Sequence, residues 1–293
     1  MLKKLYKKLT RSYWCVGLFK AEIDSYQDLN INELLPSIHW LKFGNKFNWI
    51  ADPFILDVSV NTITILVEEY VDRKGVITYL EIDKNNYQIL DSKILLELDT
   101  HLSFPFIYRE NGKVYIIPEN SSSGSVKIYV YSIAEKKLVY ITSLINEPLV
   151  DIAILKIDNY YYLFGTKSAC KDNLHIYRSK NLLTGYELFQ NIPYTSNRAR
   201  GAGSIIYVAQ NRFIRFSQEN NYTYGGGIVI SELMFLKDKF IIKEINQLIP
   251  IKNRIFGIHT YNKFLNYHII DGKILIYPII GKILLKIKKI VYG

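Results

Sequence analysis

Short apolar runs separated by polar turns follow one another along most of the chain, and one pattern of two such runs recurs. Its first copy covers residues 52–70, and later copies begin at Phe104, Asp151, Ala202 and, in a degenerate form, His259. The starts of the copies lie 52, 47, 51 and 57 residues apart. A repeat of about 50 residues with about four short strands is typical of a propeller blade.

The sequence therefore predicts an all-β chain folded as a five-bladed β-propeller. Outer strands are expected after each copy, for example at residues 75–82 and 89–96. The short fifth blade needs a further strand, which we expect from residues 14–20, so that the two ends of the chain close the ring. The alternative is a sandwich of two sheets, which the even spacing of the repeats disfavours.

The two ends of the chain carry a different pattern, in which apolar residues recur on one face of a helix and lysines fill the other. Apolar residues within 2–9 are spaced i, i+3, i+4 and i+7, and a similar stripe covers residues 279–291. We therefore expect three parts. Residues 1–13 and 277–293 are short basic amphipathic helical segments, and residues 14–276 are the propeller.

The net charge of +10 is concentrated in these two ends. Residues 1–11 hold five Lys or Arg and residues 278–293 hold four, with no acid in either, which leaves +1 for the body. Nucleic acid is therefore not expected as a partner, because its recognition needs positive charge spread over a face. Basic amphipathic helices bind anionic membrane surfaces, and we expect both ends to do so. The alternative is that they pack on the body with their lysines in solvent.

Composition and cysteine content narrow the class further. With 49% hydrophobic and 14% aromatic residues, the chain is too apolar to be disordered. Its two cysteines, Cys15 and Cys170, are too few for a disulfide framework and match no metal motif. No apolar run approaches the roughly 18 residues needed to cross a bilayer, and no signal-peptide pattern follows the basic start. We expect a cytoplasmic protein at the inner face of the membrane.

Blade geometry brings equivalent strand ends of all repeats around one axis. Asp52 begins the first repeat, and Asp151 begins the third. Glu68 and Glu69 point to opposite faces of one strand, so at most one of them faces the axis. In the first four repeats the second run ends in Glu69, Glu119, Thr166 and Gln218. Carboxylates repeated at axial positions of a nearly neutral body indicate a site in a funnel around the axis.

A series of short motifs in a fixed order makes the chain similar to a known family. The motifs are Ala51-Asp-Pro-Phe54, Val67-Glu-Glu-Tyr70, His101-Leu-Ser-Phe-Pro-Phe106, Ile117-Pro-Glu119, Arg198-Ala-Arg-Gly-Ala-Gly203 and Gly257-Ile-His-Thr-Tyr-Asn262. Over residues 45–265 the chain resembles the propeller domain found at the N-terminus of plant glucosamine inositolphosphorylceramide transferases and beside sugar formyltransferases. That domain is distantly similar to the five-bladed arabinanase and β-xylosidase glycoside hydrolases.

The resemblance to these inverting hydrolases implies a base Asp in the first blade, an orienting Asp in the third and an acid Glu in the fourth. Asp52 and Asp151 match the first two. The fourth blade has no matching Glu, because residues 198–203 occupy that region. The resemblance also allows a central divalent cation, held in part by His259. No other metal or cofactor is expected.

Three functions remain open at this point. The first is glycosyl transfer in the synthesis of a cell-surface glycan or glycolipid, with Asp52 as base and with Arg198 and Arg200 on the phosphate of a nucleotide sugar. The second is a glycoside hydrolase or phosphorylase in which Glu119 or Glu69 replaces the missing acid. The third is a non-catalytic glycan-binding module that serves a partner glycosyltransferase.

The candidate residues are shared by these hypotheses. We expect catalytic roles for Asp52, Asp151 and Glu119. We expect contacts to the sugar or nucleotide sugar from Glu69, His101, Arg198, Arg200, Gln218, Tyr224 and His259.

Overall fold

The fold is described from a computed structural model of the chain. The described residues are 6, 9–194, 196–221, 223–251, 254–281, 283, 284 and 287. Most of the two expected basic amphipathic segments, at residues 1–13 and 277–293, lies outside these residues. Within the described part of the C-terminal segment, residues 278–281 are helical.

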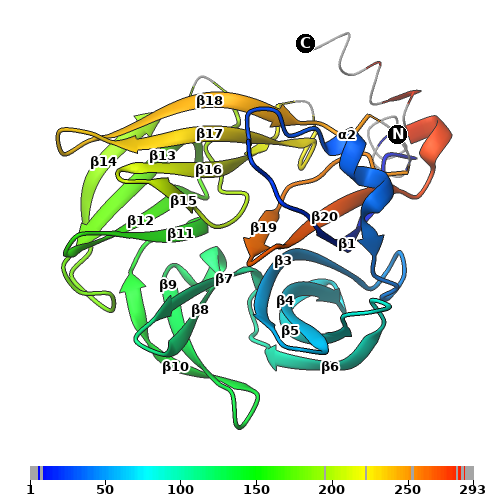
Figure 1. The fold of residues 1–293 in the computed structure, drawn as a ribbon, viewed down its shortest axis with the longest axis horizontal. Helices are drawn as coiled ribbons and strands as arrows, with labels where there is room; N and C mark the ends of the chain where they lie inside the picture. The colour runs from blue at the N-terminus through cyan, green and yellow to red at the C-terminus, as the bar shows by residue number, and fades with distance from the viewer. Residues whose placement is uncertain are drawn as a thin grey trace.

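In this described part of the chain, twenty strands form five sheets of four antiparallel strands each, arranged around a common centre (Figure 1). The first blade contains β3 (Trp49–Val58), β4 (Thr62–Val71), β5 (Lys74–Asp83) and β6 (Ile89–Leu96). The second contains β7 (Ser103–Glu110), β8 (Lys113–Glu119), β9 (Val126–Ser132) and β10 (Lys137–Ile145). The third contains β11 (Leu149–Ile157), β12 (Tyr160–Lys167), β13 (Cys170–Ser179) and β14 (Glu187–Pro193). The fourth contains β15 (Ile206–Ala209), β16 (Arg212–Glu219), β17 (Gly227–Phe235) and β18 (Phe240–Leu248). The five-bladed propeller is thus confirmed, and a two-sheet sandwich is excluded.

The fifth blade joins the two ends of the chain. It contains β19 (Tyr261–Phe264), β20 (Tyr267–Leu275), β1 (Ser12–Lys20) and the two-residue β2 (His39–Trp40). β1 pairs with β20 along its whole length, so the expected closing strand is confirmed. β2 is a further closing strand that the sequence pattern did not predict.

Two glycines let the closing strands pack tightly. A Cβ on Gly17 of β1 would overlap the side chain of Ile38, and a Cβ on Gly272 of β20 would lie 2.6 Å from the ring of Trp40. The indole of Trp40 therefore lies directly against the backbone of both strands. The short helix α2 (Ile31–Leu34) covers the same blade, where Ile31 packs with Phe216 and Tyr261.

The core lies between neighbouring blades, because each sheet buries apolar side chains on both faces. Leu66 of the first blade packs with Phe104 and Phe106 of the second, and Val16 and Leu18 of β1 pack with Ile65 of the first blade. β1 thus contributes both backbone hydrogen bonds and buried apolar surface to the closure of the ring. Among the described residues, no helix is both long enough and apolar enough to cross a membrane.

Removing one buried side chain from the closing strand tests this role. Leu18 is fully buried between the fifth and first blades. We expect Leu18→Ala to lower the free energy of unfolding by about 2 to 5 kcal/mol, the usual cost of a Leu→Ala cavity. Urea titration followed by tryptophan fluorescence measures it. Leu90→Ala, at an exposed position of β6, is the control and should change stability by less than about 1 kcal/mol. An equal loss in both variants would contradict the closing role.

Candidate functional site

The same local distortion occurs at the start of three inner strands. Asp52, Phe104 and Asp151 have positive φ angles of 48°, 41° and 48°, and at each of them the pairing of the first two strands shifts register. Such a bulge turns a side chain out of the alternation of its strand. A positive φ is also unfavourable for these residue types and needs support from the surrounding structure. The equivalence of these three positions, expected from the repeat, is confirmed.

A second set of equivalent positions lies across the ladder from these bulges. Glu68 pairs with Ala51, Glu119 with Ser103 and Thr166 with Val150. The alignment of Glu69 with Glu119 is therefore wrong by one residue. Glu69 lies on the other face of β4, where it accepts a hydrogen bond from the Thr78 hydroxyl at 2.8 Å. The same shift applies in the fourth blade, where Ser217, and not Gln218, forms the bridge to Gly201.

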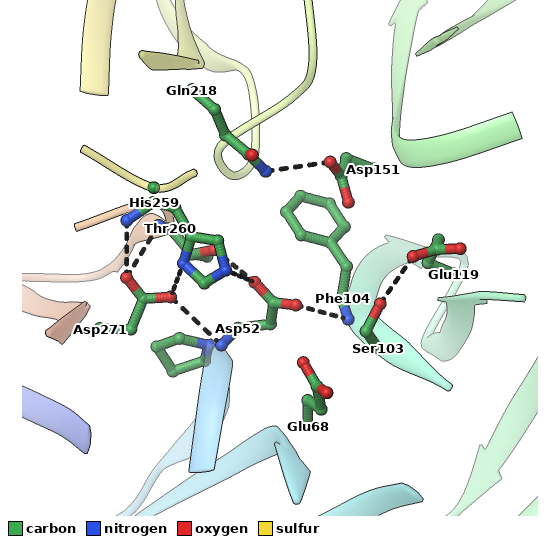
Figure 2. A network of polar contacts seen from close by, with 12 residues as sticks. Asp52, Glu68, Ser103, Phe104, Glu119, Asp151, Gln218, His259, Thr260 and Asp271 are labelled. Carbon is green, nitrogen blue, oxygen red and sulfur yellow. Dashed lines mark hydrogen bonds and ion pairs between the residues drawn. The ribbon is translucent and has the colours of Figure 1, made fainter. Parts of the chain in front are cut away.

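Asp52 lies in a buried polar network at the junction of the first and fifth blades (Figure 2). Its Oδ1 accepts the Thr260 hydroxyl at 2.6 Å, and its Oδ2 accepts the Phe104 N–H at 3.2 Å. The His259 ring lies between two carboxylates, with Nε2 3.5 Å from Asp52 and Nδ1 in close contact with Asp271. Asp271 also accepts the backbone N–H groups of His259 and Thr260. Asp52 is therefore held firmly by its neighbours.

The charge of His259 follows from this environment. Burial alone would lower its pKa, but the facing carboxylates of Asp271 and Asp52 more than offset burial and raise the pKa to about 9. The ring is thus a cation near neutral pH, flanked by two anions. Trp14 stacks on its face, with ring centroids 4.0 Å apart, and shields this ion triad from solvent.

The central cation that the resemblance allows can be tested against this donor set. Asp52, His259 and Asp271 each offer a ligand atom, and these atoms lie within 4.8 Å of one another. Both ring nitrogens, however, already face carboxylate oxygens, and a protonated imidazole cannot be a metal ligand. The proton on His259 supplies the positive charge that a metal ion would bring, so the two carboxylates fit a protonated imidazole better than a metal ion.

Asp151 forms the second carboxylate centre. Its Oδ2 accepts hydrogen bonds from Arg200 Nε at 2.5 Å and from Gln218 Nε2 at 2.9 Å. Burial raises the pKa of Asp151 to about 6, although the positive charge of Arg200 opposes the shift. Three expected site residues, Asp151, Arg200 and Gln218, are thus brought together across the third and fourth blades.

Glu68 forms a pair with His101 from the loop before β7. The His101 Nε2 lies 3.1 Å from Glu68 Oε1. The Gly75 N–H donates to His101 Nδ1 at 2.9 Å, so that nitrogen carries the lone pair and Nε2 carries the proton. Burial raises the pKa of Glu68 to about 7, even though the hydrogen bond with His101 opposes the shift. Glu68 is therefore a carboxyl group that exchanges its proton near neutral pH.

A cavity of about 330 Å³ opens beside these groups. Its wall includes Glu119, His101 and Arg200. Glu119 is held in place because its Oε2 accepts the Ser103 hydroxyl at 2.8 Å and its Oε1 accepts the Ser121 N–H at 3.1 Å. Of the three residues expected to be catalytic, Glu119 lines this cavity, whereas Asp52 and Asp151 lie deeper.

The two arginines expected to bind phosphate are already paired with carboxylates. Arg198 contacts Glu219 closely and reaches Glu244 at 3.0 Å, and Arg200 is paired with Asp151. Tyr224 lies at the mouth of the funnel, about half exposed. Its ring lies edge-on to His259, with centroids 5.3 Å apart, and 5.5 Å from the guanidinium of Arg200.

Three residues of the site were not among the expected ones: Glu68, Thr260 and Asp271. Strand alternation left Glu68 and Glu69 as alternatives, and only the register of β3 against β4 decides between them. Asp271 ends the second run of the degenerate fifth repeat, so a signal for it was present in the repeat itself. Nothing in the sequence distinguishes Thr260 from other threonines.

The fold and the buried carboxylates around its axis define a five-bladed β-propeller with a polar funnel. The sequence model of the family described as glucosamine inositolphosphorylceramide transferase 1, N-terminal, matches residues 31–277, and the chain belongs to this family. Curated relatives include glucosamine inositolphosphorylceramide transferase 1 of Arabidopsis thaliana, 27% identical over 252 residues, and that of Oryza sativa subsp. indica, 24% identical over 246. These matches cover 81% and 78% of this chain but 32% of each relative, so the chain spans about a third of their length.

Solved structures of glycoside hydrolases share the fold. The catalytic domain of a GH62 α-L-arabinofuranosidase from Coprinopsis cinerea gives a TM-score of 0.57 at 9% identity, covering 86% of this chain and 84% of that one. An exo-β-1,3-galactanase from Phanerochaete chrysosporium, solved with β-1,3-galactotriose, gives 0.55 at 12% identity, covering 68% and 49%. The resemblance seen in the sequence motifs is confirmed for the family, and for the fold of these hydrolases.

The charged state of His259 can be measured directly. Because its pKa is raised from 6.5 to about 9, the folded state holds a proton that the unfolded chain has lost. This stabilisation is complete below pH 6.5 and disappears as pH rises through 9, so the free energy of unfolding should fall by about 2 kcal/mol between pH 7 and 9.5. The ¹⁵N shifts of the ring should report a protonated imidazole at pH 7.5. The other four histidines, replaced one at a time by Gln, assign the signal. A neutral ring at pH 7.5 would contradict the ion triad.

Proposed function

We propose that the chain is the sugar-binding propeller of a glycosyl-transfer system that builds a cell-surface glycan or glycolipid at the cytoplasmic face of the membrane, beside a separate glycosyltransferase. The observation that carries the proposal is the cavity lined by Glu119, His101 and Arg200 above two buried carboxylate centres. Fixed carboxylates and an arginine are the groups that hydrogen-bond to sugar hydroxyls.

Charge pairing favours binding of a sugar over binding of a nucleotide sugar. A phosphate needs uncompensated positive charge, whereas Arg198 and Arg200 both face carboxylates at ion-pair distance. The fourth-blade acid of the hydrolases is also replaced by this arginine-containing segment, which weighs against hydrolysis. The length of the relatives supports a division of labour, because about two thirds of each curated transferase lies outside the match.

Glycosyl transfer by the propeller itself is the second candidate. It is favoured by Glu68, whose pKa of about 7 suits a proton-transferring group, and by Glu119 at the cavity wall. Release of nucleotide from a nucleotide-sugar donor, lost in Glu119→Gln, would favour this candidate over a purely binding role.

Sugar binding is tested with a panel of methyl glycosides, observed by saturation-transfer NMR and titrated where a signal appears. We expect at least one glycoside to bind the wild-type chain and Glu119→Gln to weaken it ten- to a hundredfold, the usual effect of losing a hydrogen bond to a charged group. Glu135→Gln is the control, because Glu135 lies in the same blade, is exposed and pairs only with surface groups. Binding equal in wild type and Glu119→Gln, or no binding at all, would overturn the proposal.

A further inference from the structure

The ends of the closing strands lie on the same side of the propeller as the funnel. In β1, Ser12 pairs with Leu275 at the end of β20. Two residues further along, Trp14 stacks on His259 at the axis. The loop between β2 and β3 reaches the same place, because Phe47 lines a cavity of about 600 Å³ together with Tyr13, Asn45, Lys46, Leu275 and Ile276.

This end of the fifth blade exposes large apolar side chains from two separate parts of the chain. Phe47 is 61% exposed, and in the other part Tyr277, Ile279 and Ile280 are 40%, 75% and 48% exposed. Leaving two aromatic and two aliphatic side chains in water is unfavourable unless a partner covers them. We call these four residues the end patch.

The charge around the end patch is uniformly positive. The chain segments that meet there, residues 9–20, 36–48, 254–258 and 272–281, contain no Asp or Glu. Arg11 and Lys46 both lie over the Phe47 ring, at 5.7 and 5.1 Å from its centroid. An aromatic ring flanked by cations, beside apolar side chains and without acids, is the composition of a surface that lies in the headgroup region of an anionic bilayer.

A groove lies next to the cavity at Phe47, along the closing strands. It has a volume of about 750 Å³, and its wall includes Tyr13, Trp14 and Trp40, with Lys42 and Arg254 among the residues around it. Tyr13 also lines the cavity at Phe47, and Trp14 stacks on His259. The groove thus shares Tyr13 with the cavity at Phe47 and borders Trp14, whose ring stacks on His259.

We propose that the end patch is a docking surface for an anionic lipid bilayer, and that docking turns the mouth of the funnel toward the membrane. Phe47 and Ile279 enter the interface between headgroups and acyl chains, while Arg11 and Lys46 contact lipid phosphates. The end patch would be the surface by which the chain reaches the membrane in the proposed function. The biological purpose of docking rests on that proposed function, but docking itself does not, because vesicle binding and sugar binding are measured separately.

Co-sedimentation with vesicles tests the surface in the full chain. We expect binding to vesicles of phosphatidylcholine with phosphatidylglycerol, and little binding to phosphatidylcholine alone. Phe47→Asp should weaken vesicle binding at least tenfold, because the side chain that docking would bury in the membrane interface is lost. Lys46→Glu should weaken it about 30-fold, because two units of charge change near the surface. Val60→Asp is the matched control and should bind as wild type, because Val60 is 87% exposed in the turn between β3 and β4, at the opposite end of the blades.

Several outcomes would overturn the docking surface. Equal binding to neutral and anionic vesicles would show that the positive charges do not contribute. An equal loss of vesicle binding in Val60→Asp and Phe47→Asp would show that binding does not depend on the end patch. A change from dimer to monomer in Phe47→Asp, with vesicle binding unchanged, would assign the end patch to a second copy of the chain. Circular dichroism and thermal melting verify that each variant is folded. If the methyl glycosides bind while vesicles do not, the docking surface fails and the sugar-binding proposal stands.

Discussion

The ion triad of Asp52, His259 and Asp271 is the interaction on which the centre of the molecule depends. It joins the first blade to the last, at the junction where the ring of blades closes. Two carboxylates buried this close together would repel each other and cost several kcal/mol in a dry environment. The imidazolium between them turns this repulsion into attraction, and the Thr260 hydroxyl and backbone N–H groups satisfy the remaining oxygen atoms. The start of β3, with its unfavourable positive φ at Asp52, is supported by this cluster.

The hydrogen bonds and ion pairs around the axis divide the carboxylates into those held by protein groups and those that face the cavity. Asp52 and Asp271 are bound by their neighbours, and Asp151 is bound by Arg200 and Gln218. Glu68 is buried beside His101 and has a pKa near neutral, whereas Glu119 lines the cavity. The buried carboxylates thus hold the blades in position around the axis, and Glu119 is the carboxylate that a ligand in the cavity can reach.

The architecture could be predicted from the sequence because the same pattern of apolar runs and turns occurs once in each blade. Five copies of one pattern placed the strands, and the lack of a strand in the last copy pointed to residues 14–20. The site was harder for a definite reason. Strand alternation places Glu68 and Glu69 on opposite faces of β4 but does not decide which of them faces the axis. The pairing of Glu68 with Ala51 decides it, and this register is not visible in the sequence, so Glu69 was expected where Glu68 lies. The pairing of Arg198 with Glu219 and Glu244 was equally invisible, because contacts between β-strand ends of one blade depend on loop geometry.

Closure of the fifth blade has a consequence for the synthesis of the chain. β1 is made first and β20 last, and 247 residues separate Lys20 from Tyr267. At ordinary translation rates the ribosome needs tens of seconds to cover this distance. During that time the edge of β1 has no β20 to pair with, and the Val16 and Leu18 side chains lack the last part of their core. Such an edge is a template for pairing with another nascent chain. The four other blades each consist of consecutive strands and can form as they emerge, but the ring of blades closes only when β20 arrives and pairs with β1.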